Sequence, residues 1–89
     1  MKNEWLEKKI TISEAEAENM VSDPRFGPSP VPFGFDNKEW RALVAKMQAA
    51  DELWTFSSSN ESWEHLCGRA GISLVRNGEI IDSIVTLMN

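Results

Sequence analysis

His65 and Cys67 are the two residues of this chain whose types could support nucleophilic catalysis. A thiolate becomes reactive when a neighbouring imidazole or positive charge lowers its pKa. Residues 61–67 have the pattern of a short helix, and helical positions two residues apart point about 200° away from each other. We therefore expect Cys67 to pack inward and His65 to lie on the surface, paired with Glu61, with no catalytic dyad between them.

The chain offers no template for a metal site or for acid–base catalysis. It has one histidine and one cysteine, whereas a zinc site draws on several such ligands. Its carboxylates are numerous, but they lie in polar stretches of sequence, where nothing raises the pKa of one member of a pair. We expect no metal, no cofactor and no enzymatic activity.

The run Gly68-Arg69-Ala70-Gly71 is rich in glycine, but it lacks the lysine and the length of a P-loop. It follows a predicted helix and precedes a predicted strand, whereas a phosphate cradle presents amides at the start of a helix. We interpret Gly68 as the end of a helix and Gly71 as the start of a strand. Arg69 stays exposed in this arrangement and is a candidate contact for a partner.

The composition is that of one small globular domain, residues 1–89. Apolar residues make up 42% of the chain and charged residues 26%, which argues against intrinsic disorder. The formal net charge of -5 opposes binding to phosphate backbones and to anionic lipid, so neither nucleic acid nor a membrane is an expected partner. The single cysteine cannot form an internal disulfide, and we find no leader and no long apolar run. We expect a cytoplasmic protein.

The first third of the chain predicts a strand followed by an acidic helix. Residues 4–12 suit a short strand, and a helical turn would fit almost as well. Ser13 then opens a capping box, because its hydroxyl can accept from the Glu16 amide while the Glu16 carboxylate reaches back. A helix is predicted from Ser13 to before Pro24, with a negative surface. Its predicted apolar face consists of Ala17, Met20 and Val21.

The middle of the chain predicts an ordered loop and then the clearest helix. Residues 24–35 combine four prolines and two glycines with three phenylalanines, so we predict a loop that lies over the core in extended form. Asp36 can cap a helix over residues 37–50. Its apolar positions recur with helical spacing: Trp40, Leu43, Val44, Met47 and Ala50. A strand over residues 53–57 and a helix capped by Ser58 or Asn60 follow.

The C-terminal residues predict a β-hairpin, because Asn77-Gly78 favours a two-residue type I′ turn between apolar segments. Arg76 should face Glu79 and form an ion pair with it. Counting from the turn pairs Leu74 with Ile81 and Ile72 with Ser83. The predicted core face then holds Ile72, Leu74, Ile81, Val85 and Leu87. The other face is too apolar to be bare, and we expect the phenylalanine-containing loop, a helix or another subunit to cover it.

These elements predict an α+β fold with a small antiparallel sheet packed against two or three helices. The sheet is expected to contain residues 53–57, 71–76 and 79–88, with residues 5–12 as a further candidate. Trp40, Trp54 and Trp63 fit the core. Trp5 does not, and it forms our predicted contact patch together with Phe26, Phe33 or Phe35. The alternative is that Trp5 closes one end of the core.

The segments SWEHLCGRAG and LVRNGEIIDSIVTLMN resemble those of short bacterial or phage proteins, a resemblance that assigns no role to any residue. The acidic charge and the lack of catalytic motifs favour a binding module that docks to another protein with a basic surface, as an inhibitor or immunity-type factor would. The alternative is a homo-oligomeric structural protein that buries the second hairpin face. An enzyme that uses Cys67 is the third and least favoured hypothesis.

Overall fold

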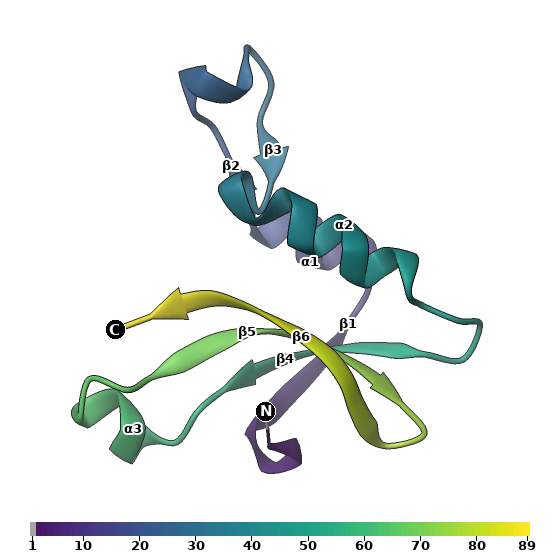
Figure 1. Ribbon diagram of the computed structural model, residues 1–89, viewed down its shortest axis with the longest axis vertical. Coiled ribbons are helices and arrows are strands. Elements are labelled where there is room, and N and C mark those ends of the chain that lie inside the picture. The colour runs from purple at the N-terminus through teal and green to yellow at the C-terminus, as the bar shows by residue number, and fades with distance from the viewer. Residues whose placement is uncertain (1) are drawn as a thin grey trace.

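The structure, a computed structural model that describes residues 2–89, has a four-stranded antiparallel sheet at its centre (Figure 1). Its strand order is β1 (Leu6–Ile10), β4 (Glu52–Ser57), β5 (Arg69–Arg76), β6 (Glu79–Met88). A second sheet pairs β2 (Met20–Val21) with β3 (Val31–Pro32). The helices are α1 (Ile12–Glu18), α2 (Asn37–Ala45) and α3 (Asn60–Glu64), and the short 3-10 turns are η1 (Asn3–Trp5), η2 (Pro24–Phe26) and η3 (Gly34–Asp36). The predicted α+β class is confirmed.

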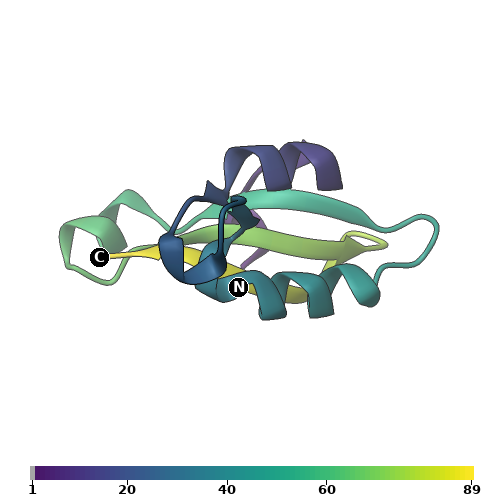
Figure 2. The same ribbon diagram turned by 90° about the horizontal axis from the view of Figure 1, so that it is seen from above.

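Helices α1 and α2 both lie over one face of the sheet, α1 on the side of β4 and α2 on the side of β6 (Figures 1 and 2). The core between the two layers is built from strand and helix side chains, with Phe33 added from the loop before η3. Its buried members are Ile10, Ala15, Phe33, Trp40, Leu43, Leu53, Ile72, Leu74 and Ile84. Burial of this apolar area is the main force that holds the layers together.

Helix α1 begins two residues earlier than predicted. Thr11 is its N-cap, and its hydroxyl accepts from the Glu14 amide while the Glu14 carboxylate accepts from the Thr11 amide, each at 3.0 Å. The start at Ser13 is therefore wrong. The same Ser/Thr-x-x-Glu spacing occurs twice, and the structure uses the earlier one, in a helix whose buried residue is Ala15. The helix ends at Glu18, so the predicted apolar face of Ala17, Met20 and Val21 does not form.

Helix α2 confirms Trp40 and Leu43 as core residues, and Val44 and Met47 pack partly buried against the core, but Ala50 is exposed and the helix is shorter than predicted. Trp40 and Leu43 are buried, whereas the chain leaves the helix after Ala45. Asp36 makes no capping hydrogen bond. Instead, the Asn37 side-chain amide donates to the carbonyl of Pro32 (2.9 Å), which fixes the start of α2 against β3.

Helix α3 is capped by Ser59 rather than by Ser58 or Asn60, since the Ser59 hydroxyl accepts from the Ser62 amide. Ser58 is buried, and its hydroxyl accepts from the Arg69 amide (2.9 Å). This hydrogen bond joins the end of β4 to the start of β5. Ser58 therefore stabilises the sheet and does not cap the helix.

The hairpin turn is confirmed, but the register beyond it differs from the prediction. Asn77 and Gly78 have φ of 53° and 79°, and Arg76 pairs with Glu79. After the pair Val75–Ile80 the next pair is Leu74–Asp82, so Ile81 is an extra residue in a β-bulge.

A shift of one residue turns every following side chain to the other face of the sheet. Ile72 therefore lies opposite Ile84 rather than Ser83, and Ile84 enters the core. Ile81 and Leu87, which the sequence predicts as core residues, are 43% and 59% exposed. A second bulge makes Thr86 the extra residue near the C-terminus, where Gly71 pairs with Val85 and Ala70 with Leu87.

The sheet face away from the helices is covered in part by the N-terminal segment. Side chains alternate along a strand, so Phe56 and Val75 point to this face, and both are buried. Turn η1 lies on the same side of the sheet (Figure 1), where the Asn3 amide donates to the carbonyl of Gly78 (2.9 Å). The loop over residues 24–35 does not cover this face, because its Phe33 packs on the helix side.

Arg76 forms an ion pair with Asp51 and not with Glu79. Its guanidinium donates to both carboxylate oxygens of Asp51, at 3.0 and 2.8 Å, and the Asp51 side chain is only 3% exposed. These hydrogen bonds from Arg76 lower the pKa of Asp51 below its usual value. The stability that the pair contributes is present above the unfolded-state pKa near 4 and is lost as the pH falls through the folded-state pKa.

Arg76→Met is therefore expected to lower the urea midpoint at pH 7, because it leaves the Asp51 carboxylate without its main donor. The difference from the wild type should shrink as the pH falls from about 4, where Asp51 becomes protonated in the unfolded state, through its lower folded-state pKa. Urea titrations between pH 2.5 and 7 measure this. Lys2→Met is the control, since it breaks an exposed 4.0 Å pair with Glu4 and should change little. A difference that is independent of pH would contradict the assignment.

Candidate functional site

Residues 20–35 form a short arm that rises from the helix layer, away from the sheet (Figure 1). The arm consists of β2, η2 and β3, and its two sides are held together by the pairs Met20–Pro32 and Val21–Val31. At its base the Phe33 amide donates to the carbonyl of Asn19 (2.7 Å). Four prolines restrict the backbone of this segment, so the arm is an ordered projection.

An aromatic cluster joins η2 to η3 along the arm. The rings of Phe26 and Phe35 meet edge to face with centroids 4.8 Å apart, and the Arg25 guanidinium lies 4.6 Å from the Phe35 centroid. Arg25 is itself held by Asp23, whose carboxylate accepts from its side chain at 3.0 and 2.7 Å and caps η2. These hydrogen bonds lower the pKa of Asp23. Phe35 remains 66% exposed although its neighbours fix its position.

The base of the arm is anchored in the core. Phe33 is buried, and its ring lies 4.5 Å from that of Trp40 between centroids. The Trp40 indole in turn donates to the Glu16 carboxylate of α1 (2.9 Å). A Cβ on Gly34 (φ 55°) would lie 3.0 Å from the Val21 side chain, which shows how closely the two sides of the arm approach. The arm is therefore rigidly connected to both helices.

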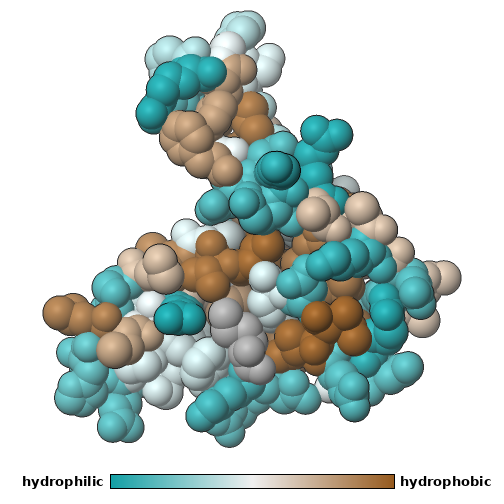
Figure 3. All heavy atoms as spheres, viewed as in Figure 1, coloured by the Kyte–Doolittle hydropathy of each residue, from teal (hydrophilic) through white to brown (hydrophobic). Residues whose placement is uncertain are grey.

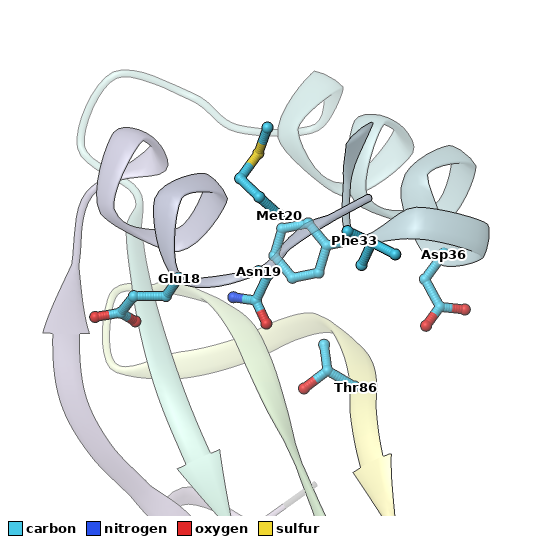
Figure 4. A pocket seen from close by; sticks show the side chains of 7 residues that line it. Glu18, Asn19, Met20, Phe33, Asp36 and Thr86 are labelled. Carbon is cyan, nitrogen blue, oxygen red and sulfur yellow. The ribbon is translucent and has the colours of Figure 1, made fainter. Parts of the chain in front are cut away.

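A pocket of about 280 Å³ opens where the arm meets the body of the protein. It is lined by Glu18, Asn19, Met20, Val21, Phe33, Asp36 and Thr86. Glu18 and Asp36 lie on opposite sides of the Phe33 ring, with Met20 above it and Thr86 below (Figure 4). The lining thus combines two carboxylates with an aromatic ring and contains no basic side chain.

Among residues 2–89, five of the eight exposed large apolar side chains lie on the arm or at the C-terminal end of β6. Met20 and Val21 are 46% and 39% exposed on the arm, and Leu87 and Met88 are 59% and 65% exposed on β6. The space-filling view shows apolar side chains along the arm, with hydrophilic ones at its tip and at its base (Figure 3). Exposed apolar groups that are contiguous and rimmed by polar ones are typical of interaction sites.

The structure separates the candidate contact residues named from the sequence. Phe26 of η2 and Phe35 of η3 come together on the arm, whereas Phe33 is buried at its base. Trp5 lies in η1 on the other side of the sheet, half-buried, with the Lys2 ammonium 5.9 Å from its ring centroid. Arg69 is exposed at the start of β5.

The sequence did not point to Met20, Val21, Asp36 or Thr86 as residues of one site. Its pattern predicts a helix through Met20 and Val21, and Thr86 becomes a pocket residue only through the second bulge of β6.

His65 and Cys67 form no catalytic pair. Helix α3 ends at Glu64 and Leu66 adopts a left-handed conformation (φ 59°), so Cys67 is exposed rather than buried as predicted. The ion pairs of residues 2–89 do not include the expected one between Glu61 and His65, which are joined by a backbone hydrogen bond instead. Within the same residues, no group of three His, Cys, Asp or Glu side chains could hold a metal ion.

Comparison with known proteins gives no match: no family model, no curated protein and no solved structure matches this chain. In the part of the chain that the structure describes, none of the helices is long and apolar enough to span a membrane. We therefore infer the function from the arm and from the pocket at its base.

Proposed function

We propose that this protein is a small acidic binding module, of bacterial or phage origin, that docks to another protein through its arm. An inhibitor or an immunity-type factor of the cytoplasm would act in this way, without chemistry of its own. The observation that carries the proposal is the exposed Phe35, held in place by Phe26 and Arg25 on an ordered projection. An aromatic side chain that is ordered before binding loses little conformational entropy when it enters a pocket.

The charge distribution supports a partner with a basic surface. The chain has a formal net charge of -5, and the two carboxylates at the base of the arm have no basic side chain between them. Complementary charge raises the association rate and excludes other partners. The arm itself is neutral in sum, because its one aspartate and one arginine, Asp23 and Arg25, pair with each other. Affinity would come from the apolar contacts of the arm, and selectivity would come from the carboxylates of Glu18 and Asp36 at its base.

A homo-oligomeric structural protein is the second candidate, favoured by the exposed Leu87 and Met88 on the edge strand β6. An edge strand offers unpaired backbone groups to another copy. However, the bulges at Ile81 and Thr86 interrupt this edge, and bulges are a device that opposes edge-to-edge pairing. A strict monomer in sedimentation at micromolar concentration would exclude this candidate.

Phe35→Ser is expected to weaken partner binding at least about tenfold, because it removes the central apolar contact of the arm. The tagged protein is used to capture a partner from a lysate of the native host, and the affinity for the purified partner is then measured by calorimetry. Leu66→Ser is the matched control, since Leu66 is 74% exposed on the α3 side of the sheet. Equal weakening by both variants, or capture of no partner, would contradict the proposal.

A further inference from the structure

We propose that the outer edge of β2 on the arm pairs with an extended, basic segment of the protein to which the arm docks. This inference rests on the proposed function and adds the mode of contact, because the partner would contribute a third strand to the two-stranded sheet of β2 and β3. A two-stranded ribbon has little stability of its own, and a further strand stabilises it.

The pairing of β2 with β3 determines which backbone groups face outward. The Phe33 amide donates to the carbonyl of Asn19, and hydrogen-bonded and non-hydrogen-bonded pairs alternate along an antiparallel ladder. The next pair, Met20–Pro32, is therefore a non-hydrogen-bonded one. The backbone groups of these two residues point away from the opposite strand, and positions two residues further along the arm face the same way.

Prolines close the outer edge of β3. Pro32 and Pro30 occupy its outward positions, and neither has an amide hydrogen to offer a neighbouring strand. The Pro32 carbonyl is already engaged, because it accepts from the Asn37 side chain at 2.9 Å. Strand addition at β3 is therefore blocked.

The outer edge of β2 keeps its donors and acceptors. Among residues 2–89, none forms a hydrogen bond with the backbone N–H or C=O of Met20 or Ser22. Met20, Val21 and Ser22 are all exposed. An extended segment along this edge would form backbone hydrogen bonds with Met20 and Ser22, and its side chains would contact those of Met20 and Val21.

The two edges of the main sheet are protected in other ways. Strand β1 has three charged residues between Leu6 and Ile10 and a register shift, and bulges interrupt β6. Charged side chains and bulges oppose the addition of a strand. Among the sheet edges of residues 2–89, that of β2 is the one without such protection.

The charge beside β2 favours a basic occupant over a second copy of the chain. Helix α1 ends two residues before β2, and it carries Glu14, Glu16 and Glu18 and no basic residue. Lysine or arginine residues in the added segment would complement this charge. The formal net charge of -5 on every copy opposes self-association.

The test is a titration of the 15N-labelled protein with the peptide acetyl-Lys-Val-Thr-Val-Lys-amide, followed by NMR. The peptide is expected to shift the amides of Met20, Val21 and Ser22, with Kd in the millimolar range. The same peptide N-methylated at its central residues cannot donate hydrogen bonds from them, so it should shift none of these amides. The analogue with glutamate in place of both lysines should bind more weakly.

Ser22→Pro and Ser22→Ala form a matched pair of variants. Proline removes the outward N–H, as Pro30 does on the opposite edge, and the preceding Val21 lies in a strand, as the residue before a proline prefers. We expect Ser22→Pro to raise the Kd at least about fivefold through the lost hydrogen bond. Ser22→Ala keeps the N–H and should retain the Kd within about twofold. The N-methylated peptide tests the same hydrogen bonds on the wild-type protein, should Ser22→Pro disturb the arm.

The inference is overturned by equal binding of the N-methylated or the glutamate peptide, by equal effects of the two variants, by no shift at millimolar peptide, or by shifts centred on β1 or β6. It is also overturned if the Met20 and Ser22 amides shift with protein concentration alone, because the occupant would then be a second copy. These titrations need no captured partner and leave Phe35 unchanged. Their failure can therefore be told apart from failure of the Phe35→Ser experiment.

Discussion

Trp40→Ala is expected to lower the free energy of unfolding by about 3–5 kcal/mol. Trp40 is 1% exposed, stacks on Phe33 and donates its indole hydrogen to Glu16. Truncation would leave a cavity between α2 and the sheet and would leave the Glu16 carboxylate without its donor. For a domain whose total stability is about 5–10 kcal/mol, this is a large fraction. Urea unfolding followed by far-UV circular dichroism measures it.

Trp40→Phe separates packing from hydrogen bonding. It retains a ring against Phe33 but has no donor for Glu16, so we expect a loss of about 1–2 kcal/mol. If Trp40→Ala were no more destabilising than Trp40→Phe, the ring would not be the element that joins the arm to the core. The comparison also concerns function, because a loosened Phe33 would release the base of the arm.

Local sequence signals predict an element correctly where a few neighbouring residues determine its conformation. The dipeptide Asn77-Gly78 predicts the hairpin turn, because both residues tolerate positive φ. The helical spacing of Trp40 and Leu43 predicted the buried side of α2. In both places one conformation satisfies the local chemistry much better than its competitors.

Where two local conformations fit the sequence almost equally well, contacts outside the local segment determine which one forms. Thr11 and Ser13 both begin a possible capping box, and the structure uses the first, in a helix that places Ala15 in the core. Similarly, Ile81 and Ile84 are equally apolar, and only the bulge beside Val75 determines which one is buried. A bulge depends on twist and packing of the whole sheet, which no short window of sequence records.

The candidate site was only partly accessible from the sequence for the same reason. The aromatic residues of the segment 24–35 predict a loop that lies over the core, and this is wrong: the segment projects away from the sheet, and only Phe33 enters the core, while Phe26 and Phe35 contact each other on the arm. The pocket, however, joins residues from α1, the arm, η3 and β6. Asp36 is predicted from the sequence to cap α2, but it makes no capping hydrogen bond and lines the pocket instead.

Gly71→Ala is expected to be the second most damaging single substitution, with a loss of about 3 kcal/mol, at the upper end of the range for overpacking. A Cβ at position 71 would overlap the backbone oxygen of Ile84 and lie 3.0 Å from the Phe56 ring. The backbone of β6 cannot rotate away as a flexible side chain would. Strands β5 and β6 would therefore have to separate. Because Gly71 pairs with Val85 beside the bulge at Thr86, the wall of the pocket should be displaced as well.

Gly78→Ala distinguishes this steric effect from the general cost of replacing a glycine. Gly78 has φ of 79°, and a Cβ added to it would meet nothing within 4 Å, so alanine there costs only backbone strain, about 1 kcal/mol. Hydrogen exchange should locate the difference: Gly71→Ala is expected to accelerate exchange of the amides in residues 83–87, whereas Gly78→Ala affects the turn alone. If both variants lost the same stability, the close approach of β6 to Gly71 would not be a constraint on the fold, and the second bulge would need another cause.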